Sequence, residues 1–207
     1  MYAIVEDNNI TQYINNPKSV VIGDVRYPAK IFQLWSQAEL NAIGIYEVIT
    51  DSTNKKDEKW YINTNESYAF ADNQVTRSWG TATPKAHADT LWTQADSDDG
   101  DLPDDKEVGD VKVEGLKTQL IRTLKQQASG LLAPTDWYVV KASEVSDYSV
   151  PTNIATYRAS VRTKSNEMET LITNATDTPA LETLYTYTEQ DDGTVTRPLG
   201  ELPTLEI

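Results

Sequence analysis

The sequence has 207 residues and a formal net charge of −14, with no cysteine and one histidine. The lack of cysteine excludes disulfides, thiolate nucleophiles and Cys-ligated zinc, and one histidine excludes a His-paired zinc site. The negative charge argues against nucleic acid and anionic membranes as partners. No apolar run approaches the ~20 residues of a membrane-spanning helix. The N-terminus lacks the basic and apolar regions of a signal peptide, so we expect synthesis in the cytoplasm.

Residues 1–95 have the pattern of a small β-rich module. Two short apolar runs, Ala3–Val5 and Ile10–Ile14, flank an Asp-Asn-Asn turn at 7–9. Such runs on either side of a tight polar turn predict a β-hairpin. The overall fold class that we predict is α+β, with this module at the N-terminus.

One short helix is predicted within the β-rich module. Ser36 is followed three residues later by Glu39, which is the spacing of a capping box at a helix start. Gly44 lies where a left-handed residue would end the helix. These start and stop signals predict a helix at about 37–43.

Aromatic and β-branched residues recur between turn residues over 59–81. The segments Trp60–Ile62, Tyr68–Phe70 and Gln74–Trp79 are separated by Asn-rich and Asp-rich turns, which predicts a small antiparallel meander. Trp60, Trp79 and, further along, Trp92 are candidate anchors for a partner protein. The alternative is that these indoles fill the core of the module.

The segment 96–110 is strongly acidic, with eight acidic residues and one lysine. The composition predicts a solvated linker that self-repulsion keeps extended. A calcium loop is the alternative, but the spacing fits the EF-hand pattern poorly, because its third ligand position would fall on Gly100.

Residues 111–176 contain two apolar stripes with helical spacing. The first stripe consists of Leu116, Leu120, Leu124, Ala128 and Leu131, and the second consists of Ile154, Tyr157, Val161, Met168, Leu171 and Ala175. Gly130 and Pro134 mark the end of the first helix, and Pro151-Thr152 marks the start of the second. The spacing favours an αα-hairpin in which the stripes face each other, and a coiled coil between subunits is the competing solution.

The stretch Thr135-Asp136-Trp137 lies between the two stripes. Asp136 could be a catalytic carboxylate, but no partner group follows at a recognisable spacing. A structural corner requires less: Thr135 or Asp136 caps the backbone at the turn, and Trp137 covers the junction as a buried indole. Trp137→Ala would then cost about 3–5 kcal/mol of unfolding free energy.

Residues 177–207 predict a short β-hairpin followed by an extended tail. An alternating segment contains Asp192-Gly193, a dipeptide typical of hairpin turns. The tail has little core of its own, so its apolar residues are candidates for docking on a partner, with disorder as the alternative. These residues are Leu202, Leu205 and Ile207.

Two stretches resemble known phage proteins. "LLAPTDWYVV" with the later "YRASVRTKSNEMETLI" resembles the C-terminal module of bacteriophage tail assembly chaperone-type proteins. The matching positions are Leu131, Leu132, Asp136, Trp137, Pro151, Tyr157, Arg158, Val161 and Arg162. "YPAKIFQLWSQAELNAIGIYEV" is similar to N-terminal segments of phage tail-fibre and virion proteins. Together the stretches cover about a third of the chain, and each is short.

The resemblance implies a non-enzymatic phage tail protein that is made in the host cytoplasm and binds other tail or fibre proteins. It would be either a virion component that connects tail fibre to tail or baseplate, or an assembly chaperone that is not retained. Homo-oligomers are expected, since tail parts repeat around symmetry axes. No cofactor or metal is expected. The rival class is a carbohydrate-binding or glycan-hydrolysing module, in which Trp60 and Trp79 would stack on sugars.

Overall fold

The computed structural model describes residues 1–205 and contains both helices and strands. The chain divides into two compact units, Met1–Thr83 and Pro84–Ile207. This boundary differs from the predicted one at residue 95. Residues 84–95 belong to the second unit because their backbone pairs with later segments: Leu116 N–H donates to the Ala86 carbonyl at 3.0 Å, and the Thr178 hydroxyl donates to the Lys85 carbonyl at 2.6 Å.

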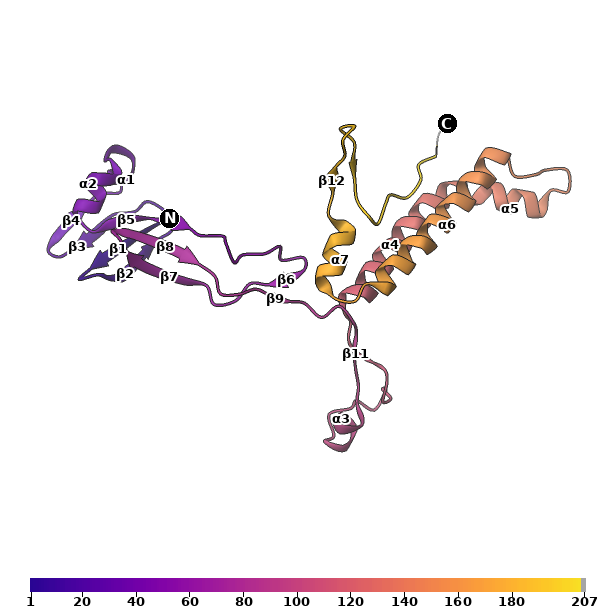
Figure 1. The fold of residues 1–207 in the computed structure, drawn as a ribbon, viewed down its shortest axis with the longest axis horizontal. Coiled ribbons are helices and arrows are strands. Elements are labelled where there is room, and N and C mark those ends of the chain that lie inside the picture. The colour runs from indigo at the N-terminus through magenta and orange to yellow at the C-terminus, as the bar shows by residue number, and fades with distance from the viewer. Residues whose placement is uncertain (206–207) are drawn as a thin grey trace. The chain divides into compact units, whose positions relative to one another are not determined.

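A curled five-stranded sheet forms the centre of the first unit (Figure 1). The strand order is β2-β1-β5-β8-β7, and β5 and β8 are parallel while the other neighbours are antiparallel. The strands are β1 (Tyr2–Glu6), β2 (Asn9–Ile14), β5 (Ile45–Thr50), β7 (Ser67–Ala71) and β8 (Gln74–Ser78). The curl brings the two edge strands together, since the ring centroids of Tyr13 and Tyr68 are 4.8 Å apart.

Two Asp-Asn turns close the hairpins of this sheet. Asp7-Asn8 has φ values of 50° and 62°, and Asp72-Asn73 has values of 51° and 61°. Asparagine and aspartate tolerate this left-handed backbone better than other non-glycine residues. The predicted N-terminal hairpin is confirmed. In the predicted meander β7 and β8 do pair, but β6 (Tyr61–Ile62) forms a separate ladder with β9 (Thr83–Pro84).

Two short helices and a hairpin cover one face of the sheet. They are α1 (Ile31–Leu34), α2 (Gln37–Ala42), β3 (Val20–Ile22) and β4 (Val25–Tyr27). The predicted capping box is present: Ser36 N–H donates to Glu39 Oε2 at 2.8 Å, and Glu39 N–H donates to Ser36 Oγ at 3.3 Å. Helix α1 was not predicted, so the unit has a second short helix besides the expected one.

The core of this unit lies on both faces of the sheet. The face covered by α1 and α2 buries Ile4, Ile14, Val20, Ile31, Leu40 and Ile45. The opposite face buries Ala3, Val5 and Val75. Gly44, which ends the α2 connection with φ of 84°, is tightly packed, because a Cβ there would lie 2.8 Å from the Val5 carbonyl oxygen. Glycine is therefore required at this position.

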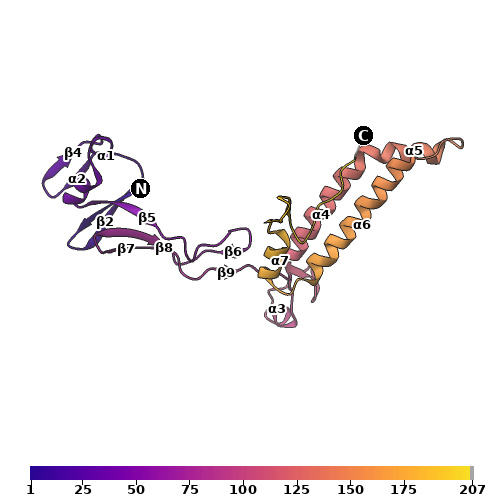
Figure 2. The ribbon, with the colours of Figure 1, turned by 45° about the horizontal axis from the view of Figure 1, so that its top comes forward.

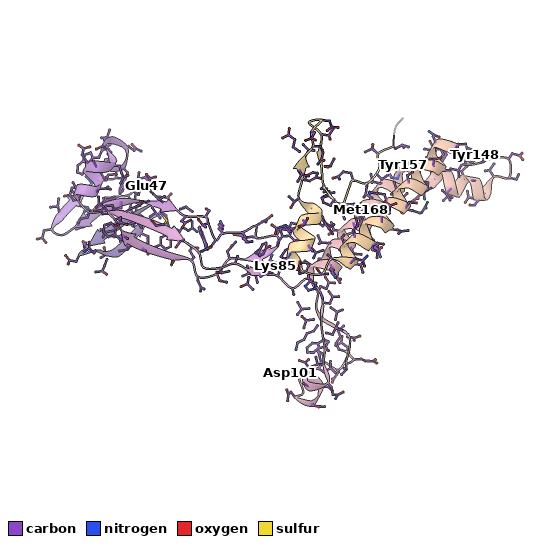
Figure 3. The ribbon with its side chains drawn as sticks, viewed as in Figure 1. Glu47, Lys85, Asp101, Tyr148, Tyr157 and Met168 are labelled. Atoms are coloured by element: carbon purple, nitrogen blue, oxygen red, sulfur yellow. The ribbon has the colours of Figure 1, made fainter. Side chains whose placement is uncertain are left out.

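Two long antiparallel helices form the main body of the second unit (Figure 2). Helix α4 (Leu116–Leu132) packs against α6 (Thr152–Asn174), and a 3₁₀ turn (Ala133–Thr135) and α5 (Asp136–Glu144) connect them. Helix α6 buries Ile154, Tyr157, Val161, Met168 and Ile172, whereas Leu171 of the predicted stripe is 38% exposed and its neighbour Ile172 is buried instead. The apolar stripes thus pack within one chain, and Figure 3 labels Tyr157 and Met168 along α6.

The acidic segment forms a loop between two paired strands, so the prediction of an extended linker is wrong. Strands β10 (Thr90–Leu91) and β11 (Val111–Val113) pair, and α3 (Gln94–Asp98) lies between them. Gly109 N–H donates to the Trp92 carbonyl at 2.8 Å, which joins the two ends of the segment. Lys112 pairs with Asp96 and lies 4.3 Å from the Trp92 ring centroid. One cation and one helix cap thus offset the self-repulsion that the composition predicted.

Acid is expected to loosen this ladder. The hydrogen bond from Lys112, with further bonds from Thr93, holds the pKa of Asp96 well below its ordinary value of 3.8. A depressed carboxyl pKa stabilises the fold above the unfolded value and ceases to do so as the pH falls through the folded value. The Trp92 indole NMR signal should therefore stay native at pH 4 and shift only well below it. Asp96→Asn should show the shift already at pH 7, whereas Asp99→Asn at the exposed end of α3 should not.

The C-terminal segment packs on its own helices. After α7 (Thr178–Tyr185), β12 (Thr188–Glu189) and β13 (Val195–Thr196) form the predicted hairpin. Leu199 is buried, and Leu202 and Leu205 pack against the cluster of Ala128, Tyr157 and Val161. The expectation that Leu202 and Leu205 are available for docking on a partner is thus wrong, because both pack against α4 and α6 of the same chain. Ile207 lies outside the described residues.

Truncating one tail leucine should release part of this contact. Leu202→Ala is expected to lower the free energy of unfolding by about 1 kcal/mol, since Leu202 is only half-buried. Limited proteolysis within residues 199–205 should accelerate in the variant. Val195→Ala, at a position that is 60% exposed, is the matched control and should leave both measurements unchanged.

Candidate protein-binding surface

A buried arginine holds the corner between α4 and α5. The Arg158 side chain is 8% exposed, and its Nη2 lies 2.7 Å from Asp136 Oδ1. Its Nη1 donates to the Leu132 carbonyl at 2.9 Å and to the Thr135 hydroxyl at 2.6 Å. The Thr135 hydroxyl in turn donates to the Leu132 carbonyl at 2.7 Å. Arg158 thereby satisfies backbone groups that the end of a helix leaves without intrahelical partners.

The other predicted corner residues contribute unequally. The Tyr157 hydroxyl donates to the Leu131 carbonyl at 3.2 Å, and Leu131 and Leu132 pack against the Tyr157 cluster. Arg162 is exposed, and its Nη1 reaches only the Arg158 carbonyl, at 3.4 Å. Of the two predicted caps, the Thr135 hydroxyl does bond a backbone carbonyl, that of Leu132, whereas Asp136 pairs with the Arg158 side chain.

Trp137 does not cover the junction, and the prediction that it is buried there is wrong. The indole is 52% exposed and lies against Tyr138, with ring centroids 3.9 Å apart. The guanidinium of Arg158 lies at the junction instead, hydrogen-bonded to the Leu132 carbonyl and the Thr135 hydroxyl. The signal was present in the sequence: four bulky residues in succession, 137–140, span about 300° of a helix and cannot share one buried face.

Helix α5 has an exposed apolar surface. None of its nine residues is buried. We use the name α5 surface for its exposed apolar side chains and the valine that follows them: Trp137 (52%), Val139 (43%), Val140 (52%) and Val145 (44%). A helix of this length is marginal in water without tertiary packing, and exposed apolar clusters of this kind mark interaction sites. Figure 3 shows this helix next to the connection that carries Tyr148.

A shallow groove lies along the outer side of α4. Its volume is about 640 Å³, and its lining, which we call the α4 groove, consists of Thr118, Ile121, Arg122, Lys125, Gln126 and Ser129. Arg122 pairs with Glu114 at 2.6 Å, and Lys125 pairs with Glu169 at 2.8 Å. Both cations keep more than half of their side-chain surface exposed. The groove therefore combines one apolar side chain, Ile121, with two exposed cations that are each paired with a glutamate.

The tryptophans that were candidate anchors are largely inside the protein. Trp60 is 3% exposed and Trp79 is 7% exposed, so the interpretation of these two as partner anchors is wrong. Trp79 lies between cations, with Arg77 4.6 Å and Lys55 4.9 Å from its ring centroid. Trp92 is half-buried beneath Lys112. The residue that does present an indole to solvent is Trp137.

The described residues offer little for metal chemistry. In residues 1–205 no group of three or more His, Cys, Asp or Glu side chains is placed to hold a metal ion. His87 is half-buried, and its carbonyl accepts a hydrogen bond from Lys117 N–H at 3.0 Å. Within the same range no helix has the length and apolar character that crossing a membrane requires.

Comparison with known proteins identifies no relative: no protein-family model, no curated protein and no solved structure matches this chain. A functional assignment therefore depends on the α5 surface, the α4 groove and the two short motif resemblances.

Proposed function

We propose that this protein is a non-enzymatic component of a bacteriophage tail, a virion structural protein that connects tail fibre to tail or baseplate through protein–protein contacts. In this proposal the β-rich and helical units are separate attachment modules. The resemblance of the Leu131–Val140 segment and of residues 27–48 to phage tail proteins supports the phage context. The α5 surface supports the mode of action.

The α5 surface is the observation that carries this proposal. Tryptophan is among the residue types most enriched in interface hot spots, and Trp137 is 52% exposed with the equally exposed Val140 three residues further along on the same face of α5. The fold gives α5 no intramolecular core to bury these side chains. A partner protein that covers α5 would supply the packing that the chain itself lacks.

Mass spectrometry of purified phage particles tests the proposal. A virion component should be present at a fixed stoichiometry relative to the other tail proteins, and Trp137→Ala should reduce its incorporation without lowering its stability. If infectious particles assemble normally when the host cell makes none of this protein, any role in the tail is contradicted.

An assembly chaperone is the second candidate, because an exposed apolar helix equally suits transient binding of fibre subunits. In that case the protein should be required for infectious particles and yet be absent from them. The carbohydrate-binding alternative loses its two stacking residues, since Trp60 and Trp79 are buried, and we do not propose it.

A further inference from the structure

The α5 surface ends in negative charge. Trp137, Val140 and Glu144 lie on one face of α5 at helical spacing. Glu144 and Asp147 are exposed and have no ion-pair or hydrogen-bond partner among the side chains of residues 1–205. Lys141 lies 4.3 Å from the Tyr148 ring centroid, which leaves these two carboxylates unneutralised. The surface thus presents an indole and a valine followed by anionic groups.

The α4 groove is complementary to this arrangement. Thr118, Ile121, Lys125 and Ser129 form a single stripe on α4, with Arg122 beside it. Helix α4 carries Lys117, Arg122 and Lys125 and no acidic residue, in a chain whose net charge is −14. Arg122 and Lys125 are already paired with Glu114 and Glu169, but more than half of each cation's side chain is exposed and such pairs contribute little, so each cation can contact a further carboxylate on its exposed side.

We propose that the α5 surface of one copy docks in the α4 groove of a second copy. Trp137 and Val140 would cover Ile121, while Glu144 and Asp147 would lie near Arg122 and Lys125. Trp137 and Val140 of α5 are exposed, and no residue of α5 lines the α4 groove of the same chain. Both surfaces are therefore available to a second copy. The inference rests on the premise of the proposed function that α5 is a protein-binding surface, and it names the partner.

The two surfaces are different, so the contact is heterologous. A heterologous contact produces a ring when its rotation closes and a chain of subunits when it does not, and both suit a part that repeats in an assembly. A nine-residue helix buries less than a standard interface, so a single contact is weak and ring closure would add to it through multivalency. Two copies of charge −14 repel each other, but at about 0.15 M salt this repulsion is screened beyond about 8 Å and the local contacts remain.

Sedimentation equilibrium of the full chain at about 0.15 M salt tests the proposal. The wild type should show an average mass above that of one chain, rising with protein concentration. Trp137→Ala and Ile121→Glu should each weaken association by about 30-fold or more, which is the range for hot-spot losses. Val195→Ala, which removes an exposed valine elsewhere in the unit, should associate like the wild type.

Mixing the two weakened variants gives the decisive result. The Trp137→Ala chain keeps an intact α4 groove, and the Ile121→Glu chain keeps an intact α5 surface, so an equimolar mixture should form a 1:1 dimer and nothing larger. A mixture that stays monomeric would overturn the proposal, as would a monomeric wild type. Because Ile121 is half-buried, Arg122→Glu with circular dichroism as a check of folding serves as the second groove variant, and it should complement Trp137→Ala in the same way.

The failure of this inference is distinguishable from the failure of the proposed function. If the wild type is monomeric and Trp137→Ala still abolishes incorporation into particles, α5 binds a different tail protein and only the self-association is wrong. If the mixture forms the dimer while particles lack the protein, the self-association stands and the role in the virion fails.

Discussion

Arg158→Ala is expected to lower the free energy of unfolding of the C-terminal unit by about 2–3 kcal/mol, because it removes a charged donor from two groups inside the protein, while Asp136 is 58% exposed and can be solvated. The substitution removes the hydrogen bonds from Arg158 to the Leu132 carbonyl and the Thr135 hydroxyl, together with its ion pair with Asp136. Thr135 is 2% exposed, so water cannot replace the lost donor freely. Hydrogen exchange of the α4 and α6 amides during denaturant titration measures this loss for that unit alone.

Arg162→Ala is the matched control for this result. Arg162 lies one turn further along α6, is exposed, and makes a single long contact with the Arg158 carbonyl. Its replacement should change stability by no more than about 0.5 kcal/mol. Equal effects of the two substitutions would show that the corner does not depend on the buried guanidinium, and that general loss of positive charge on α6 explains both.

The second large effect is expected in the N-terminal unit. Trp60→Ala should cost about 3–5 kcal/mol, because an indole that is 3% exposed leaves a large cavity when it is truncated. Exchange of the amides of β6 (Tyr61–Ile62), the strand that directly follows Trp60, is the measurement. Trp60→Phe should recover part of the loss, since a smaller aromatic ring fills part of the cavity.

Trp137→Ala is the control for this prediction, and it reverses the expectation from the sequence. An indole that is 52% exposed should cost less than about 1 kcal/mol of stability in the isolated chain. A loss of several kcal/mol at Trp137 and none at Trp60 would contradict the structure and restore the sequence-based assignment of the two tryptophans. The two measurements therefore separate a core role from a binding role for each indole.

The tryptophans show why the candidate site could be predicted only in part. The interpretation of Thr135-Asp136-Trp137 as a corner assigned the central position to Trp137, whereas the structure places Arg158 there. Whether Trp137 is buried depends on which other side chains the fold places at the junction. The side chain that lies there belongs to Arg158, which is 22 positions from Asp136 along the chain. Neither periodicity nor composition contains that distance information.

Local signals in this chain determined local structure. The Ser36 cap, the Asp7-Asn8 turn and the α6 start at Thr152 were all readable because each depends on residues a few positions apart. The tertiary structure alone decided the parallel pairing of β5 with β8, the closure of the acidic segment by Lys112, and the docking of Leu202 on α4 and α6. Those outcomes join residues that are distant in sequence, where burial of apolar surface and pairing of charge act through the fold and leave no short-range pattern.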